Sequence, residues 1–323
     1  MKDIDNKELI LHNKKDLINF FKFSSYLQLN YLSFWNNSHS KKIYIKTRIP
    51  KRNWDYREIL IPNDRLKQAQ KHILKHILWF WIDKTLSEHA YGFVKEKSIY
   101  DNAKCHIWSK TLVKIDLENF FPTITQSRVY GMFRKIFNYN HIVSSYLSGL
   151  CTFDNKLPQW APTSPAISNI IASKIDKRLL QYLSKIDNNI SYSRYADDIT
   201  IWLKNQTNIW NLIKQINNII EEEWFLINYN KLRIINTKWA MKVTGLTINN
   251  WNVGVWRKRY KWIRAIIHNI KLNWRIKAKD QYVEYKQMPN ISIENFKNII
   301  NWHINYISMI NLKMWKKLKD SLS

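Results

Sequence analysis

The segment "ISYSRYADDITIWL", residues 190–203, contains two β-type runs joined by a short turn. Because such runs flanking turn residues are typical of paired strands, the segment predicts an antiparallel hairpin. Asp197 and Asp198 stand at its turn. Asp is common in turns for its own hydrogen bonds, so an isolated pair usually has only a structural role. A catalytic role requires another carboxylate from elsewhere in the chain.

A third carboxylate follows a second predicted strand. The segment "TLVKIDLENFFPTIT", residues 111–125, alternates into a short buried strand that ends at Asp116, and Thr125 can cap the next helix. If the two strand regions are neighbours, three carboxylates converge and repel one another unless cations are present. Hard oxygen ligands with an open face suit Mg²⁺. Two such ions support in-line displacement at phosphorus, so the pattern favours nucleotidyl transfer.

The remaining sequence alternates helical and strand patterns, which predicts an α+β core. Two β-rich runs surround a basic tip in residues 41–62, and a helix with apolar spacing follows in residues 65–86. Further helices are expected at residues 126–137, 164–183 and 209–224, and further strands near residues 225–230 and 241–249. From about residue 256 the pattern becomes helical and basic.

The charge balance favours a polyanionic partner. The chain has 52 Lys and Arg against 25 Asp and Glu, a formal net charge of +27. Aromatic residues, 14% of the chain, can stack on bases, although a solvated basic surface is the alternative explanation. The first residues lack an apolar signal core, and no window approaches 18 apolar residues, so membrane insertion is not expected. Two cysteines are too few for a disulfide scaffold, which favours a cytoplasmic location.

The motifs, taken together, resemble those of reverse transcriptases. "YADD" at residues 195–198 is similar to their catalytic hairpin, and "KIDLENFF" at residues 114–121 is similar to their first carboxylate motif. "NAKCH" at residues 102–106 resembles the N-A-x-x-H element of retron reverse transcriptases, and "VTGL" at residues 243–246 resembles their V-T-G element. The resemblance implies a retron-type RNA-directed DNA polymerase.

The resemblance also implies an architecture and a biological role. The fold would be a right-hand polymerase, with N-terminal helices and fingers in residues 1–110, a ferredoxin-like antiparallel palm in residues 111–250 and a basic helical thumb in residues 251–323. The enzyme would copy its own structured non-coding RNA into multicopy single-stranded DNA, primed from a 2′-hydroxyl, in anti-phage defence. Its partners would be the RNA–DNA hybrid, deoxynucleoside triphosphates and an effector protein of the same operon. The alternatives are another bacterial defence or group II intron-like reverse transcriptase, and a non-catalytic RNA-binding protein that retains the fold.

Catalytic and nucleotide-binding roles follow from the resemblance by position. Asp116, Asp197 and Asp198 would hold two Mg²⁺ ions, with Mn²⁺ as the alternative metal and the backbone carbonyl of Leu117 assisting. Lys231 in "NYNK" matches a lysine that protonates the leaving pyrophosphate, and a solvated lysine is the alternative. The expected nucleotide-binding residues are Lys51, Arg57, Phe121 and Gln159.

The resemblance implies a specific function for two of these nucleotide-binding residues. Phe121 matches the aromatic residue that blocks a 2′-hydroxyl and selects deoxynucleotides, and an ordinary core Phe is the alternative. Arg57 matches the fingers arginine that contacts the triphosphate, and a guanidinium is suited to fork onto phosphate oxygens.

RNA contacts are expected from two motifs and from the basic helix. Asn102 and His106 stand one helical turn apart and can share a face, which favours RNA contact or local hydrogen bonding over half of a metal site. The helix of residues 257–279 would follow the template–primer duplex along its phosphates. The expected template–primer residues are Asn102, His106, Val243, Thr244, Gly245, Lys258, Arg259, Arg264, Lys271 and Arg275.

Glycine is scarce and tryptophan is abundant. The chain has 5 Gly and 16 Trp, whereas average usage near 7% would give roughly 23 Gly. Five tryptophans stand where turn chemistry or the resemblance favours glycine: Trp54, Trp108, Trp160, Trp224 and Trp302. Trp224 follows the helix that ends at "IIEEE", where a left-handed cap is expected. One hypothesis is an enzyme that tolerates large rings at turns. The other is that UGA codons meaning glycine have been translated as tryptophan, and five UGG codons would exclude it.

Overall fold

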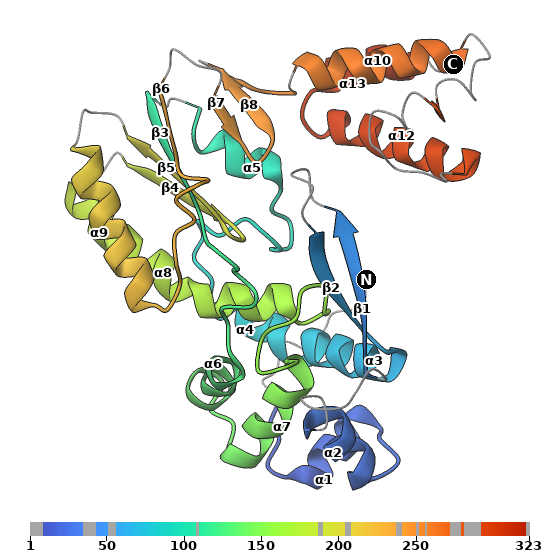
Figure 1. The fold of residues 1–323 in the computed structure, drawn as a ribbon, viewed down its shortest axis with the longest axis vertical. Coiled ribbons are helices and arrows are strands. Elements are labelled where there is room, and N and C mark those ends of the chain that lie inside the picture. Colours follow the sequence, from blue (N-terminus) through green and yellow to red (C-terminus); the bar gives the residue numbers. More distant parts are fainter. Residues whose placement is uncertain are drawn as a thin grey trace. The chain divides into compact units, whose positions relative to one another are not determined.

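The computed structural model describes residues 9–34, 43–50, 56–107, 110–186, 190–203, 208–236, 241–249, 252–255, 257–271, 279–280 and 292–320. The chain divides into two compact units. The first unit comprises Met1–Lys97 and Val113–Arg233, and the second comprises Ser98–Leu112 and Ile234–Ser323. Figure 1 shows the elements of both. The short segment Ser98–Leu112 is thus an insertion of the second unit between two parts of the first.

The first unit opens with helices and the predicted basic-tipped hairpin. Strands β1 (Tyr44–Pro50) and β2 (Tyr56–Pro62) pair antiparallel, which confirms the hairpin expected in residues 41–62. The helices of this unit are α1 (Lys14–Phe21), α2 (Tyr26–Phe34), α3 (Asp64–Ile73), η2 (Leu74–Leu78), α4 (Trp79–Thr85), α6 (Gln126–Gly131), η3 (Met132–Ile136), α7 (His141–Cys151), α8 (Ser164–Ile186) and α9 (Ile209–Glu222). The expected Thr125 cap is confirmed, since its side chain accepts a hydrogen bond from the backbone N–H of Arg128 at the start of α6.

A four-stranded sheet has the strand order β4-β5-β3-β6. Its strands are β3 (Thr111–Asp116), β4 (Ser191–Tyr195), β5 (Asp198–Leu203) and β6 (Arg233–Asn236). Tyr195 pairs with Asp198 in the antiparallel β4–β5 hairpin, which leaves Ala196 and Asp197 as a two-residue turn. Because β5 lies beside β3, the predicted neighbourhood of the two carboxylate motifs is confirmed (Figure 1).

The inner side chains of this hairpin belong to the main hydrophobic core. Ile199 and Ile201 of β5 are fully buried, together with Leu179 of α8 and Ile216 of α9. Burying each such side chain stabilises the fold by about 1.5–3 kcal/mol. Apolar residues of α8 and α9 therefore pack against the sheet, and the carboxylate motifs lie at the end of this core.

Helix α9 ends in a left-handed cap, as predicted. The backbone N–H of Trp224 donates to the carbonyl of Glu221 (2.8 Å), and that of Phe225 donates to the carbonyl of Ile220 (3.1 Å). This pair of bonds is a Schellman motif, whose left-handed position usually holds glycine. Trp224 occupies that position with φ of 61°.

The second unit combines a short helix, a small sheet and the basic helical segment. Helix α5 (Ile99–Lys104) packs on strands β7 (Met241–Val243), β8 (Leu246–Asn249) and β9 (Asn252–Gly254), which form a sheet in that order. Helices α10 (Arg257–Lys271), α12 (Ile293–Ser308) and α13 (Leu312–Asp320) follow. Ile263, Ile266 and Ile267 of α10 are buried, so one side of the basic helix packs in the interior of this unit.

Two sequence-based expectations were wrong. Residues 225–230 do not form a strand, because Ile227 makes only an isolated bridge with Leu117 before the chain turns at Asn228–Lys231. Trp302 does not stand at a turn, because it lies inside α12, where the helical backbone has negative φ. Within the described residues, no helix has both the length and the apolar character needed to cross a bilayer.

Candidate active site

Three aspartates are positioned by the end of β3 and the β4–β5 turn. Asp116 is the last residue of β3 and is 7% exposed. The backbone N–H of Leu117, the next residue, donates to the backbone carbonyl of Asp197 at 2.9 Å. Asp198 begins β5, directly after the turn. The backbone of the first motif is thus hydrogen-bonded to the turn that carries the other two carboxylates.

The three carboxylates influence one another. Burial, together with the charges of Asp198 and Asp116, raises the pKa of Asp197 to about 6. Burial also raises the pKa of Asp198, and the charge of Asp116 acts in the same direction against the lowering effect of Lys114 and Lys231. These shifts mean that ionising both turn aspartates costs free energy, because they are buried beside other negative charges.

Lys231 supplies a positive charge to this group. Its Nζ lies 2.9 Å from both carboxylate oxygens of Asp116. The turn that presents it is fixed to the same strand end, because the backbone N–H of Asn228 donates to the carbonyl of Asp116 (2.8 Å). The hydrogen bond to Asp116 raises the pKa of Lys231, so the amine stays protonated at neutral pH. The structure thus places the predicted lysine in contact with the first aspartate.

The donor chemistry fits a hard divalent cation. The described residues contain no group of three or more His, Cys, Asp or Glu side chains arranged to hold a metal ion. However, the pKa of both turn aspartates is raised partly by neighbouring negative charge, a repulsion that a bound cation would relieve. Asp116, Asp197 and Asp198 therefore remain the predicted metal-binding side chains, and the carbonyl of Leu117 remains a predicted ligand.

The predicted nucleotide-binding residues lie in different settings. Phe121 is half-buried, with its ring centroid 5.5 Å from that of Phe120 and 6.3 Å from that of Phe93. Gln159 is half-buried near the start of the proline loop, residues 157–165 with three prolines, in which Ser164 Oγ donates to the carbonyl of Pro158 at 2.6 Å. Lys51 lies outside the described residues. Arg57 lies in β2, but its side chain is outside the described part.

Trp160 follows Gln159 in that loop and has glycine-like geometry. Its φ is 77°, in the left-handed region that bulky side chains disfavour. The side chain is 65% exposed, so packing contributes little to holding this conformation. Trp224 has the same combination of a left-handed φ and a side chain that is 77% exposed. Both positions suit glycine, whereas Trp54 and Trp108 lie outside the described residues.

The N-A-x-x-H and V-T-G elements meet in the second unit. Asn102 Nδ2 donates to Thr244 Oγ1 (3.4 Å), and Thr244 Oγ1 donates to the carbonyl of Ile99 (3.2 Å). Thr244 and Gly245, with φ of 47° and 83°, form the two-residue turn between β7 and β8. The sequence did not predict this contact, because the two elements are 142 residues apart.

Most of these motif residues are buried and therefore do not form an exposed RNA-binding surface. Asn102 is 1% exposed, and His106 and Val243 are fully buried. Burial lowers the pKa of His106 to about 3, so its ring is neutral at physiological pH. Gly245 is exposed at the tip of its turn. Local hydrogen bonding, the alternative weighed for Asn102, is therefore what the structure shows, while RNA contact remains a prediction for this group.

The basic helix carries both exposed and packed cations. Lys258 and Arg264 are exposed on α10, as a phosphate-binding role requires. Arg259 is partly buried, with its guanidinium 4.0 Å from the ring centroid of Tyr306 and Nη2 3.2 Å from His303 Nδ1. Lys271 ends α10, but its side chain, like the whole of Arg275, is outside the described part.

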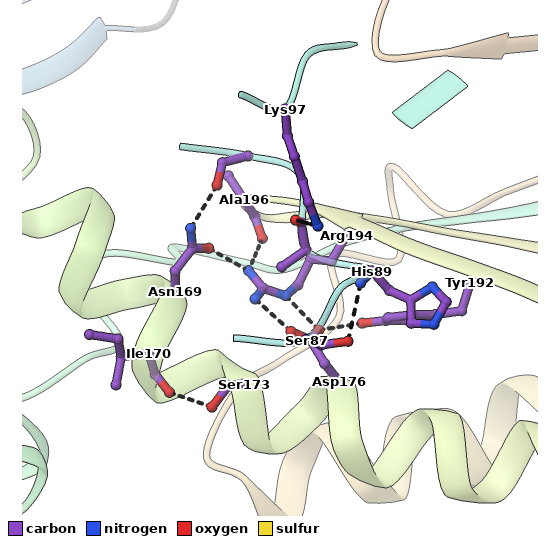
Figure 2. A network of polar contacts seen from close by, with 12 residues as sticks. Ser87, His89, Lys97, Asn169, Ile170, Ser173, Asp176, Tyr192, Arg194 and Ala196 are labelled. Carbon is purple, nitrogen blue, oxygen red and sulfur yellow. Dashed lines mark hydrogen bonds and ion pairs between the residues drawn. The ribbon is translucent and has the colours of Figure 1, made fainter. Parts of the chain in front are cut away.

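A buried polar network that reaches Ala196, the residue before Asp197, was not predicted from the sequence (Figure 2). Arg194 of β4 is fully buried and forms a bidentate ion pair with Asp176 of α8, with both N–O distances at 2.7 Å. The hydroxyl of Tyr192 donates to Asp176 at 2.6 Å. Arg194 Nη1 also donates to Asn169 Oδ1 (2.9 Å) and to the carbonyl of Ala196 (3.2 Å). An Arg next to the Tyr of "YADD" in a buried strand is the only local signal.

Comparisons with known proteins agree with this geometry. The family model described as "Reverse transcriptase (RNA-dependent DNA polymerase)" matches residues 49–248. The retron Ec86 reverse transcriptase of Escherichia coli is 39% identical over 215 residues, which cover 66% of this chain and 65% of that protein. The retron Mx162 reverse transcriptase of Myxococcus xanthus is 32% identical over 279 residues, which cover 76% of this chain and 56% of that protein. The chain thus spans less than two thirds of the length of these relatives.

A solved structure agrees at the level of the fold. Telomerase from Candida albicans, solved with a fragment of telomeric RNA, aligns with a TM-score of 0.51 and 12% identity. The alignment covers 92% of this chain and 64% of that one. This similarity, with the mixed helices and sheets, confirms the predicted α+β right-hand polymerase fold, and the retron relatives confirm the resemblance drawn from "NAKCH" and "VTGL".

Proposed function

The chain belongs to the reverse transcriptase (RNA-dependent DNA polymerase) family, and on this basis we propose that it is a retron-type RNA-directed DNA polymerase. The observation that carries the proposal is the backbone hydrogen bond from Leu117, the residue after Asp116, to Asp197 in the β4–β5 turn, within the residues that match the family model. The fold would divide into fingers (residues 1–110), palm (111–250) and thumb (251–323).

The proposed chemistry is nucleotidyl transfer at the three aspartates. Two Mg²⁺ ions held by Asp116, Asp197 and Asp198 would activate the primer hydroxyl and stabilise the leaving pyrophosphate, with Mn²⁺ as a substitute. Lys231 neutralises Asp116 in the absence of metal and is already protonated, as a proton donor to pyrophosphate must be. Its position beside the carboxylates supports the role that the sequence assigned to it.

Substrate binding is proposed for residues around this centre. Arg57 and Lys51 would contact the triphosphate, Phe121 would exclude a ribose 2′-hydroxyl, and the proline loop that begins around Gln159 would border the nucleotide. The net charge of +27 and the exposed cations Lys258 and Arg264 support binding of an RNA template and the RNA–DNA hybrid along α10.

The biological role is proposed from the retron relatives. The enzyme would synthesise multicopy single-stranded DNA from its own structured RNA in the cytoplasm, primed by an RNA 2′-hydroxyl. It would act with an effector protein in defence against phage. The similarity to reverse transcriptases named for retrons Ec86 and Mx162 supports this role.

Primer extension tests the enzymatic claim. The purified chain, an RNA template, a DNA primer, deoxynucleotides and Mg²⁺ should give metal-dependent DNA synthesis. Asp197→Asn should abolish synthesis, because it removes one carboxylate charge with little change in volume. The matched control is Asp83→Asn at an exposed position of α4, which should remain fully active. Template binding without synthesis by the chain, including a Trp160→Gly variant, would instead indicate a non-catalytic RNA-binding protein.

Co-expression with the DNA that flanks the gene tests the retron claim. A retron enzyme should yield single-stranded DNA whose 5′ end remains attached to RNA and is released by a nuclease specific for 2′,5′ bonds. The Asp197→Asn variant should yield none. DNA synthesis from added primers only, without an RNA-linked product, would favour another bacterial reverse transcriptase.

A further inference from the structure

The turn that carries Asp197 is held by hydrogen bonds and packing from residues that have no part in the proposed chemistry. Ala196 has φ of 57°, a left-handed conformation that residues other than glycine rarely adopt. Such a conformation persists only where the surroundings hold it. The carbonyl of Ala196 accepts a hydrogen bond from Arg194 Nη1 (3.2 Å), and both residues are buried.

Arg194 is itself anchored to one face of α8. Two of its nitrogens pair with Asp176, which leaves Nη1 to reach Asn169 and Ala196 (Figure 2). Asn169 and Asp176 lie seven residues apart, or about two helical turns, and therefore share a helix face. The guanidinium thus connects the backbone of the turn to α8, a helix of 23 residues.

A second chain segment closes the other side of the turn. Asn169 Nδ2 donates to the carbonyl of Gly92 at 2.6 Å, so the same amide binds both Arg194 and this segment. The backbone N–H of Tyr91 donates to the carbonyl of Arg194 (2.8 Å). A Cβ atom on Gly92 would lie 2.4 Å from the backbone nitrogen of Ala196, so the two backbones pack without room for a side chain.

We propose that Arg194 and Asn169 are positioning residues that fix the Ala196–Asp197 turn between α8 and Gly92 and thereby set the metal affinity of Asp197 and Asp198. The inference rests on the proposed polymerase function. Neither residue reaches the metal in this role. They hold the backbone from which the two carboxylates project, and outer contacts of this kind typically change metal affinity by about 10- to 100-fold.

Three variants separate positioning from general stability. Arg194→Lys keeps the charge beside Asp176 but loses the fork that reaches Ala196. Asn169→Ala keeps the Arg194–Asp176 ion pair and removes both bonds of the amide, the one to Gly92 and the one from Arg194 Nη1. The matched control is Tyr192→Phe, which removes the hydroxyl that donates to Asp176 Oδ1 and leaves every bond to the turn in place.

Metal binding is measured directly on the full chain without substrate, by electron paramagnetic resonance of Mn²⁺ and by calorimetry with Mg²⁺. Arg194→Lys and Asn169→Ala should bind about tenfold more weakly or worse, and should need correspondingly more Mg²⁺ for half-maximal DNA synthesis. Tyr192→Phe should lower the melting temperature but bind metal like the wild type. Circular dichroism establishes that each variant is folded, and Asn169→Ala carries the test if Arg194→Lys does not fold.

The outcomes distinguish this inference from the proposed function. Wild-type metal affinity in folded Asn169→Ala, or an equal loss of affinity in Tyr192→Phe, would overturn the positioning role while the wild type still makes DNA. A wild-type chain that neither binds Mn²⁺ nor makes DNA would overturn the proposed function, and the positioning role with it.

Discussion

Replacing Trp160 or Trp224 by glycine is expected to stabilise the protein, contrary to the usual effect of glycine substitutions. A bulky residue in the left-handed region costs about 1–2 kcal/mol relative to glycine. Glycine offsets about 0.5–1 kcal/mol of this gain, because it makes the unfolded chain more flexible and so favours unfolding. Both tryptophans are largely exposed, at 65% and 77%, so little buried apolar surface is lost. The expected net gain is about 0.5–1 kcal/mol for each substitution.

Trp302 provides a matched control with the opposite sign. It is also a largely exposed tryptophan, at 58%, but it lies inside α12 and stacks on Tyr306, with ring centroids 5.8 Å apart. Glycine in a helix interior lacks both the stacking and the backbone restriction of a larger residue. Trp302→Gly should therefore lower the free energy of unfolding by about 0.5–1 kcal/mol or more.

Urea unfolding of the full chain, followed by circular dichroism, measures all three effects under one condition. The urea midpoint should rise for Trp160→Gly and Trp224→Gly and fall for Trp302→Gly. A fall for all three would refute the reasoning from backbone strain. Trp160→Gly should also increase DNA synthesis, and an unchanged rate would contradict the placement of its loop at the nucleotide. Under the UGA hypothesis the Trp160 and Trp224 codons are UGA. If both codons are UGG, the hypothesis is excluded, while the prediction from backbone strain still holds.

The remaining predictions concern proton uptake, close packing and charge. The pKa of His106 is about 3 in the folded protein and 6.5 in the unfolded chain, so the free energy of unfolding falls as the pH drops below 6.5 and the unfolded state takes up a proton. His106→Leu should therefore make the decrease in unfolding free energy between pH 7.5 and pH 5, measured by urea unfolding, smaller by about 2 kcal/mol. Gly92→Ala should slow primer extension about 100-fold by displacing Ala196, whereas Gly131→Ala, with no atom within 4 Å of the added Cβ, should retain wild-type activity. Lys231→Gln should slow single-turnover nucleotide addition about 100-fold while template affinity, measured by fluorescence anisotropy, stays unchanged.

Local patterns were sufficient to predict the main elements of the site. The β-type runs around Asp197 predicted the hairpin, and the buried run ending at Asp116 predicted the neighbouring strand. Thr125 and Trp224 were correctly placed at a helix start and a left-handed helix end. These features depend on side-chain period and capping, which act within a few residues of the chain.

The interior polar contacts could not be predicted in the same way. Arg194 is a charged residue in a strand, and its burial depends on Asp176, which lies 18 residues upstream on a helix. The bond between Asn102 and Thr244 joins two motifs whose meeting depends on the packing of α5 against a separate sheet. In residues 225–230 the apolar composition suggested a strand, but the turn that brings Lys231 to Asp116 ends the pairing after one bridge.

The bridge from Asn169 to Gly92 has a consequence for the order of folding during synthesis. Its two partners are 77 residues apart, and Asn169 reaches Arg194 across a further 25 residues. On a ribosome, the Gly92 segment leaves the exit tunnel first and must wait for both α8 and the hairpin before its carbonyl gains a partner. Contacts of such long range form late, because their loops must close before the bonds form. We therefore expect the nascent chain to acquire its N-terminal helices early and its catalytic turn only after most of the first unit has been translated.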